Sequence, residues 1–285
     1  MADAPGKPTE TRRLLGISEA GWHGFEVDRW RGGDGVPTIC VHGLTRSARD
    51  FDWLAPALAA KGDVWCPDIV GRGRSDWLRD SDHYQVTQYV RDMASLVSVI
   101  GDGPVDWVGT SMGGLIGMVL AATPGSPIRR LVLNDVGPFV SAAAMADIQN
   151  VFAPESFDDQ VAFRRWLDDA MSDWGPLPSH VLDHLAATGS RPLPEGRVAR
   201  AFDPGIGETL AKTGPQTVDL WLLWEAISCP VLVLRGERST LLEELTADRM
   251  AEREHVRLVT IPHCGHAPSL MVPEQIALVA EWLAG

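Results

Sequence analysis

Short apolar runs alternate with longer amphipathic stretches along most of the chain. The runs have the length and β-branched content of strands, and the stretches between them repeat apolar residues at helical spacing. This alternation predicts an α/β fold, with a mostly parallel, eight-stranded sheet and helices on both of its faces. The expected strands lie near residues 12–18, 25–31, 37–42, 63–67, 105–109, 130–135, 230–235 and 256–261, and the expected helices near 48–60, 85–100, 112–122, 240–253 and 273–284.

One long interval breaks this alternation. It separates the strand near 130–135 from the strand near 230–235 and is rich in helical pattern, tryptophan and proline. An interval of this length is too long for a loop inside a compact domain. We therefore expect a helical cap at residues 138–228, inserted into a core domain that consists of residues 1–137 and 229–285.

Composition narrows the choice of partner and compartment. The chain has 285 residues, of which 45% are hydrophobic, and a formal net charge of −13. This excess of negative charge would repel nucleic-acid phosphates, and it gives no reason to expect an acidic membrane partner. The chain starts with a polar segment and has no strongly apolar run of the roughly 18 residues that a membrane span needs. We expect a cytoplasmic protein that binds neither nucleic acid nor membrane.

The four cysteines give no sign of a disulfide framework or a metal site. Cys40, Cys66, Cys229 and Cys264 are scattered without a closely spaced pair. Buried, reduced thiols are therefore expected. Cys264 precedes a histidine by two residues, which makes it a candidate reactive thiol. Because no group of ligand side chains has suitable spacing, we expect neither a metal nor an organic cofactor.

The most informative motif is the Gly-x-Ser-x-Gly run at residues 109–113. It follows a short strand-like run and precedes an apolar, glycine-rich helical stretch. In this context the motif is typical of a nucleophile elbow, a sharp strand-to-helix turn that exposes the serine hydroxyl at the edge of a sheet. Gly109 and Gly113 have to be small because strand and helix nearly touch there. Ser111 is therefore the candidate nucleophile.

A serine hydroxyl needs a base within hydrogen-bond reach. His266 is the candidate base, because it lies in the loop after the last strand, and such loops gather at the carboxyl edge of a parallel sheet. His263 is a weaker rival because it follows that strand too closely. The backbone N–H groups of Met112, next after the serine, and of Leu44, in the turn after the third strand, are the candidate oxyanion donors.

Taken together, these motifs resemble the α/β-hydrolase superfamily over nearly the whole chain. The chain looks most like the branch of capped esterases and carbon-carbon-bond hydrolases. This resemblance implies that the glycine-rich segment at residues 71–75 shapes the structure, and the segment lacks the lysine of a phosphate-binding loop. In the family's order and approximate spacing stand His42-Gly43, Pro67-Asp68, Gly71-Arg72-Gly73-Arg74-Ser75, the elbow at 109–113 and Gly265-His266.

The acid that would orient His266 is the point at which the chain departs from this family. The resemblance places an aspartate in the turn after the strand near 230–235. That turn reads Gly-Glu-Arg-Ser-Thr, and Thr240 stands at the expected position. The sequence therefore leaves the third member of the triad open.

Asp135 is the acid that we expect. It ends the strand near 130–135, a place that some α/β-hydrolases use for their acid, and it follows Ser111 by one helix and one strand, which returns it to the same sheet edge. Glu237 or Glu243 in the usual turn is an alternative. A site without any acid is another, since removal of the carboxylate slows catalysis but does not abolish binding.

The substrate pocket is expected between cap and core. Cap aromatics would form an apolar chamber, although tryptophans at helical spacing are also typical of a core. His42 precedes the glycine turn and is expected to brace the loop beside the pocket rather than to act as a base. The candidate pocket residues are His42, Trp166, Trp174, Trp221 and Trp224.

These features predict a serine hydrolase that cleaves small, largely apolar carboxylic esters through an acyl-enzyme. Ser111 would be the nucleophile, His266 the base and Asp135 the acid. The expected partner is a small-molecule ester.

Two other functions remain open at this point. The resemblance allows hydrolysis of a carbon-carbon bond in ring-fission diketone acids, with Arg164, Arg165 or Arg191 binding the substrate carboxylate. Those relatives carry Asn before the nucleophile, whereas this chain has Thr110. The second alternative is a non-catalytic protein that binds an apolar ligand in the cap pocket.

Overall fold

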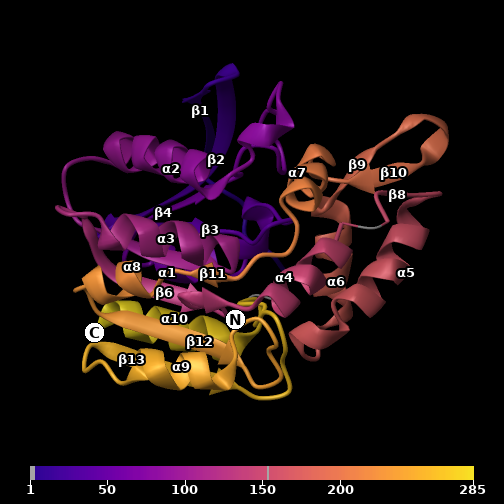
Figure 1. Cartoon of the computed structure of the whole chain (residues 1–285). Coiled ribbons are helices and arrows are strands. Elements are labelled where there is room, and N and C mark those ends of the chain that lie inside the picture. Colours follow the sequence, from indigo (N-terminus) through magenta and orange to yellow (C-terminus); the bar gives the residue numbers. More distant parts are fainter. Residues whose placement is uncertain (1–3, 153) are drawn as a thin grey trace.

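An eight-stranded sheet forms the centre of the molecule (Figure 1). The computed structural model describes residues 4–152 and 154–285. The strands of this sheet are β1 (Glu10–Ser18), β2 (Gly21–Asp34), β3 (Thr38–Val41), β4 (Gly62–Pro67), β5 (Val105–Thr110), β6 (Ile128–Asn134), β12 (Val231–Gly236) and β13 (Val256–Ile261). They are arranged in the order β1-β2-β4-β3-β5-β6-β12-β13.

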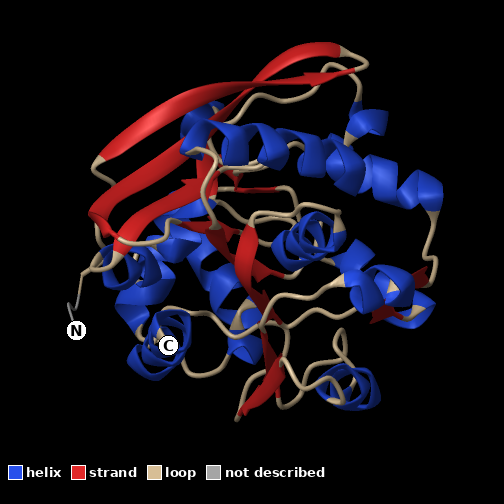
Figure 2. Cartoon of the chain, turned by 90° about the vertical axis from the view of Figure 1, so that its left-hand side faces the viewer, coloured by secondary structure: helices blue, strands red, loops and turns tan. Residues whose placement is uncertain are grey.

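Most of this sheet is parallel, as the sequence predicted. Strands β1 and β2 pair antiparallel with each other, and β2 pairs antiparallel with β4. All other neighbours in the sheet pair parallel. Since every parallel pair needs a crossover connection, helices have to cover both faces. Figure 2 shows helices on both sides of the twisted sheet.

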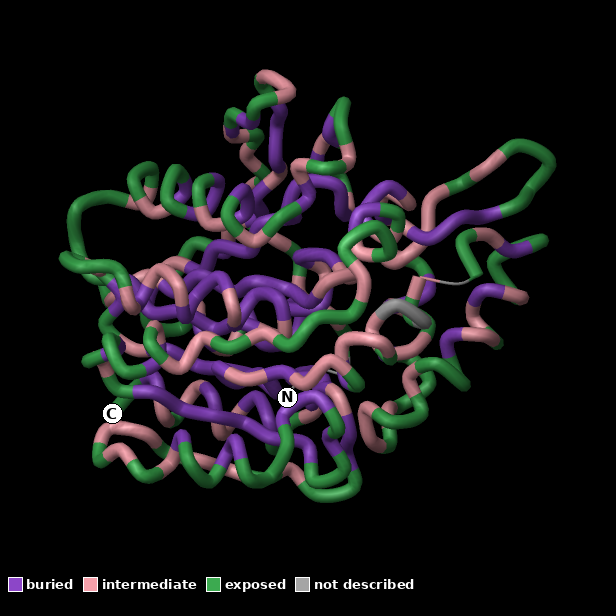
Figure 3. The backbone as a smooth tube through the Cα atoms, viewed as in Figure 1, coloured by how far each residue is buried: buried purple, intermediate pink, exposed green. Residues whose placement is uncertain are grey.

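Each central strand sends alternate side chains into two separate apolar layers. On β5, Trp107 enters one layer and Val108 the other. The first layer is covered by α2 (Val86–Ile100), α3 (Met112–Ala122), α8 (Trp221–Ala226) and α9 (Glu244–Ala251), and the second by α1 (Leu54–Ala59) and α10 (Pro273–Ala284). This arrangement buries the strands on both faces (Figure 3). It explains why they are apolar runs without a polar side.

Two helices differ from the sequence expectation. The helix expected at 48–60 is a 3-10 turn, η1 (Ala48–Phe51), followed by α1. The helix expected at 240–253 starts at Glu244, because the residues before it form a turn that belongs to the candidate site. A further 3-10 turn, η2 (Ser81–His83), precedes α2. No helix in the described ranges is both long and apolar enough to cross a membrane.

The segment between β6 and β12 holds short strands as well as the expected helices. Its three-stranded sheet has the order β8-β10-β9, and its two-stranded sheet pairs β11 with β7. The elements are β7 (Phe139–Val140), α4 (Ala142–Asn150), β8 (Ser156–Phe157), α5 (Gln160–Ala170), η3 (Ser172–Trp174), α6 (Ser179–Thr188), β9 (Ser190–Pro192), η4 (Pro194–Gly196), β10 (Val198–Arg200), α7 (Gly205–Thr213), β11 (Val218–Asp219) and α8. Figure 1 shows α4 to α7 grouped at one side of the sheet.

The last helix of this segment covers the sheet. Trp224 of α8 and Ile227 after it belong to the same buried cluster as α3. Helix α8, which lies within the segment 138–228 that was expected to form a cap, therefore packs on the sheet. Helices α5 and α6, which belong to the expected cap, pack against the other layer, because Phe163 and Leu185 share a cluster with Leu54 of α1.

Candidate active site

Ser111 occupies a strained turn between β5 and α3. Its backbone has φ 50° and ψ −114°, a conformation that side-chain-bearing residues rarely adopt. A Cβ on Gly109 would lie 2.3 Å from the carbonyl oxygen of Gly113, and a Cβ on Gly113 would lie 2.1 Å from the carbonyl oxygen of Val41. Strand and helix are thus too close for a side chain at either glycine. A 2.9 Å hydrogen bond from Ser111 N to Asn134 O connects the turn to the end of β6.

Three side chains form a hydrogen-bonded chain at this turn. His266 Nε2 lies 3.0 Å from Ser111 Oγ, and His266 Nδ1 lies 2.7 Å from Asp135 Oδ2. An ionised carboxylate can only accept, so Nδ1 carries the proton and Nε2 is free to accept from the serine hydroxyl. The structure therefore brings together the nucleophile, base and acid that the sequence suggested.

The last residue of β12 and the turn after it supply hydrogen-bond donors to Asp135. The carboxylate of Asp135 is fully buried and accepts hydrogen bonds from Gly236 N at 2.8 Å and from Ser239 Oγ at 2.5 Å. Ser239 Oγ in turn accepts from Leu242 N at 3.1 Å, which fixes its orientation. Thr240, at the position where the resemblance placed an aspartate, is exposed. The turn thus contributes a hydroxyl donor to Asp135 at the place where the resemblance implied the acid itself.

The alternative acids lie elsewhere. Glu237 Oε2 accepts a 2.8 Å hydrogen bond from His263 N and is half-exposed. Glu243 is the exposed residue before α9. Among the described residues, the carboxylate that contacts His266 is that of Asp135, which is the acid that the sequence favoured over these alternatives.

Arg72 links the two residues that were expected to donate to an oxyanion. Its guanidinium is fully buried and donates from Nε to Leu44 O at 2.8 Å. Its Nη2 approaches Met112 Sδ at 3.7 Å. Leu44 lies beside Ser111 in the lining of one cavity, and Met112 begins α3, where backbone N–H groups have no acceptor within the helix. Arg72 belongs to the glycine-rich segment 71–75, so this segment shapes the site, as the resemblance implied.

His42 braces the loop and does not line the pocket. It is fully buried, with Nδ1 2.7 Å from Gly43 O and Nε2 accepting from Ile69 N at 3.0 Å. Burial lowers the pKa of His42 below its usual value, which favours the neutral imidazole that these two hydrogen bonds require. The expectation that His42 lines the pocket is therefore corrected. The expectation that it braces the loop agrees with its hydrogen bonds.

A cavity of about 420 Å³ opens above Ser111 and His266. Trp166 and Trp174 from the cap lie in its wall, as expected. Trp221 and Trp224 are not among the described residues that line this cavity. Arg249 stacks over Trp221 at 3.7 Å, and Trp224 is buried against α3. The expectation for these two residues is wrong because their helical spacing reflects the packing of α8 on the core.

Two arginines in the cavity were missed by the sequence analysis. Arg46 and Arg200 line it together with Asp50. By contrast, Arg164 is paired with Asp168 and Asp183 on the cap surface.

The other two arginines considered earlier also lie outside the described lining. Arg191 stacks over Trp77 at 4.9 Å, and Arg165 is exposed on α5. No sequence signal marks Arg200, because its only local feature is the end of a very short strand.

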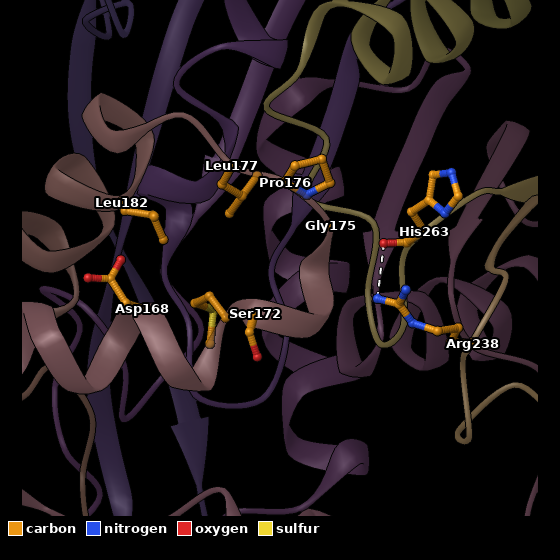
Figure 4. A pocket seen from close by; sticks show the side chains of 9 residues that line it. Asp168, Ser172, Gly175, Pro176, Leu177, Leu182, Arg238 and His263 are labelled. Carbon is orange, nitrogen blue, oxygen red and sulfur yellow. Dashed lines mark hydrogen bonds between the residues drawn. The ribbon is translucent and has the colours of Figure 1, made fainter.

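A second hollow of about 440 Å³ adjoins the first, and Met171 lines both. It lies between the cap and the loop that carries His263 (Figure 4). There Arg238 donates to His263 O at 3.1 Å and pairs with Asp173 at 3.2 Å. Asp173 also accepts a backbone hydrogen bond from Gly265, so the cap contacts the histidine loop directly.

Cys264 has the properties of a packing residue. It is buried, and its Sγ lies 3.3 Å from Trp174 O. Burial, with a smaller contribution from the Asp135 charge, raises the pKa of the Cys264 thiol to about 12, so it is protonated at neutral pH and a poor nucleophile. Across residues 4–152 and 154–285, no group of three or more His, Cys, Asp or Glu side chains is arranged to hold a metal ion.

The sheet topology, the elbow and the Ser111–His266–Asp135 chain define a protein with the architecture of an α/β-hydrolase. The chain matches the alpha/beta hydrolase family over residues 38–282 and belongs to it. It is 39% identical to the 3-hydroxybutyrate-oligomer hydrolase of Cupriavidus necator, over 94% of this chain and 96% of the relative.

Solved structures show the same fold. A putative hydrolase from Rickettsia typhi has a TM-score of 0.89 at 29% identity and covers 96% of this chain and 98% of its own. An alpha/beta hydrolase from Novosphingobium aromaticivorans has a TM-score of 0.86 at 36% identity, with the same coverage of both chains.

Proposed function

We propose that the protein is a serine esterase that hydrolyses small carboxylic esters through an acyl-enzyme. Ser111 is the nucleophile, His266 the general base and Asp135 the acid that orients the histidine. The observation that carries this proposal is the hydrogen-bonded chain of 3.0 Å and 2.7 Å that links the three side chains beside a cavity of about 420 Å³. Such an arrangement activates a serine hydroxyl, which is otherwise a weak nucleophile.

In the first half of the reaction, Ser111 Oγ attacks the ester carbonyl carbon. A carbon-oxygen bond forms, and the hydroxyl proton passes to His266 Nε2. The carbonyl oxygen becomes an oxyanion and accepts hydrogen bonds from the N–H groups of Leu44 and Met112. When the carbon-oxygen bond to the leaving group breaks, the alcohol departs with the proton from Nε2.

In the second half, water cleaves the acyl-enzyme. His266 Nε2 takes a proton from the water as its oxygen attacks the acyl carbon, and returns it to Ser111 Oγ as the acid product leaves. Asp135 stays ionised throughout and stabilises the imidazolium that forms twice in each cycle. The hydrogen bonds from Gly236 N and Ser239 Oγ hold that carboxylate in place.

The relative from Cupriavidus necator supports a more specific substrate class. Its name states hydrolysis of 3-hydroxybutyrate oligomers, and the likeness spans nearly all of both chains. A fold alone does not name a substrate, but likeness of this extent includes the cap and the pocket. The cavity volume is in the usual range for small-molecule sites. We propose short oligoesters of a hydroxy acid as substrates.

The two alternative functions predict different behaviour. A carbon-carbon-bond hydrolase would turn over a ring-fission dienoate faster than any ester. A non-catalytic binding protein would be stabilised by ligand without turnover. The second alternative depended on an incomplete triad, and the contact between His266 and Asp135 removes that reason for it.

Ester turnover by matched variants tests the proposal. Wild-type protein should hydrolyse p-nitrophenyl butyrate and the 3-hydroxybutyrate dimer, and Ser111→Ala should lower kcat by at least about 10³-fold. Ser172→Ala is the control, because its hydroxyl bonds to Asp169 O on the surface. A fluorophosphonate should label Ser111, as read by peptide mass spectrometry. Full turnover by Ser111→Ala, or no turnover of any ester by wild type, would refute the assignment.

A further inference from the structure

Arg200 is a buried cation without a carboxylate partner. It ends β10 and is 8% exposed. Its Nη1 donates to Val151 O, and within the described ranges no Asp or Glu carboxylate lies within ion-pair distance of its guanidinium. A charge taken out of water is costly unless another charge or a ligand compensates it. The side chain faces the cavity that also contains Ser111 and His266.

The other arginine of the cavity is neutralised. Arg46 donates from Nε and Nη2 to both carboxylate oxygens of Asp50, at 3.0 Å and 2.6 Å. Asp50 is the one carboxylate among the described lining residues. Because Asp50 is paired with Arg46, Arg200 is the arginine of the described lining whose charge is left without a carboxylate. This contrasts with the formal net charge of −13 of the whole chain.

Aromatic rings fix the orientation of the Arg200 guanidinium. Its central carbon lies 4.8 Å from the Trp166 ring centroid and 4.7 Å from that of Phe202. These cation–π contacts restrict the motion of the guanidinium, and its N–H groups that are not bonded to Val151 O remain donors that match the two oxygens of a carboxylate. Arg200 is thus oriented before any ligand binds.

We propose that Arg200 binds a carboxylate on the substrate, so that the preferred ester is an anion with a free carboxylate some distance from the scissile bond. This inference rests on the esterase function proposed above. It makes Arg200 a specificity residue of the cavity, and it fits an oligoester of a hydroxy acid, which ends in a carboxylate.

The protonation of Arg200 is consistent with this role. Burial, and to a smaller extent the charge of Arg46, lower the pKa of Arg200 to about 9, so the guanidinium remains charged at neutral pH. A bound carboxylate would favour the charged form further. A purely structural role, in which Arg200 only holds Val151 O, would not distinguish anionic from neutral substrates.

A matched pair of substrates tests the proposal. One is the 3-hydroxybutyrate dimer, and the other is the same dimer with its terminal carboxylate converted to a primary amide. Both contain the same internal ester bond. For wild type we expect kcat/KM to favour the acid over the amide by roughly 10- to 100-fold, the range expected for a charge-assisted hydrogen bond. In Arg200→Gln this ratio should fall to near one, mainly through KM. Arg165→Gln, on the exposed face of α5, is the control and should keep the wild-type ratio.

The outcomes separate the two proposals. If wild type hydrolyses neither dimer nor any other ester, the esterase function fails. If wild type hydrolyses both dimers equally, or if Arg200→Gln lowers both rates by the same factor, the esterase stands and the carboxylate site is refuted.

A second measurement does not depend on a stable Arg200→Gln protein. Butyrate and butyramide are compared as inhibitors of p-nitrophenyl butyrate hydrolysis by the wild-type enzyme. The anion should inhibit competitively at concentrations roughly tenfold or more below those needed for the amide. Equal inhibition by the two compounds would overturn the proposal.

Discussion

Asp135 and Ser239 follow different strands, and their side chains together form one end of the candidate triad. Asp135 follows β6, whereas Ser239 lies in the turn after β12, and their side chains meet at 2.5 Å in a buried position. The adjacent β6 and β12 run parallel, so both turns open at the same edge of the sheet. An acid on one turn and its donor on the other can therefore serve the same histidine.

Loss of the Ser239 hydroxyl should weaken the triad without removing it. Ser239→Ala removes one of the two donors to Asp135 Oδ2 and leaves His266 Nδ1 as the other. A hydrogen bond to a charged group is worth about 1.5–3 kcal/mol. We expect kcat to fall roughly 10-fold or more, as measured with p-nitrophenyl butyrate. Thr240→Ala removes an exposed hydroxyl from the adjacent position and should retain wild-type kcat. Equal kcat values for the two variants would show that Ser239 has no positioning role.

Individual residues were predictable from sequence only where a local pattern marks them. Ser111 is marked by its motif, His266 by its place after the last strand, and Asp135 by the end of β6. Ser239 and Arg200 have no such signal. Ser239 lies 104 residues from Asp135 in the sequence, and its role exists only once β6 and β12 are adjacent.

At the scale of elements, the elbow depends on how closely β3, β5 and α3 approach one another. Gly113 is the narrowest point, because a Cβ there would meet the Val41 carbonyl oxygen at 2.1 Å and the carbonyl carbon at 2.6 Å. Backbone atoms cannot turn aside as a flexible side chain can. A substitution would have to move the helix relative to β3, and with it the Ser111 hydroxyl.

Gly113→Ala should therefore destabilise the protein and lower its activity together. We expect a loss of about 1–3 kcal/mol in the free energy of unfolding, the usual cost of overpacking, and a reduced kcat. Gly103→Ala is the control, since a Cβ there meets nothing within 4 Å, and should change stability by less than about 0.5 kcal/mol. Urea denaturation measures the free energy of unfolding of both variants, and p-nitrophenyl butyrate hydrolysis measures their kcat. A Gly113→Ala protein as stable and active as wild type would contradict the close packing described here.

The elements themselves were largely predictable, because strands buried on both faces are apolar runs and the helices between them are periodic. The hydrophobic pattern was least informative where tertiary packing sets the boundaries of a helix or the partner of its buried side. The helix expected at 48–60 is interrupted at Asp52, which is fully buried and pairs with Arg49 and with His184 of the cap. The periodicity of α8 showed that it has a buried side but not that this side faces α3.

At the scale of the whole molecule, cap and core share one of the two apolar layers. Phe163 and Leu185 of the cap belong to the same cluster as Leu54 and Ile276 of the core. His184 Nε2 adds a polar contact at 3.1 Å from Arg49 O. We therefore expect the cap to unfold with the core and not before it, and pH effects on any buried group to act on the whole fold.

His42 should make the stability of the fold depend on pH. Its pKa in the folded state lies below the unfolded value of 6.5 because of burial. The folded state thus binds this proton less readily, so the stabilisation is fully present above pH 6.5 and is lost as the pH falls toward the folded pKa. The contribution to the slope is up to about 1.4 kcal/mol per pH unit. Urea denaturation of wild type and His42→Gln at several pH values should give a smaller slope for the variant. Identical slopes would contradict this account.

The most direct test of the proposed triad is the turnover of Asp135→Asn. An amide cannot stabilise the His266 imidazolium and favours the wrong tautomer, so kcat for p-nitrophenyl butyrate should fall by about 10⁴-fold while the fold is retained, as checked by circular dichroism. Glu237→Gln, which changes the alternative carboxylate, should keep kcat close to wild type. Wild-type turnover by a folded Asp135→Asn enzyme, or a comparable loss in Glu237→Gln, would show that Asp135 is not the acid of this site.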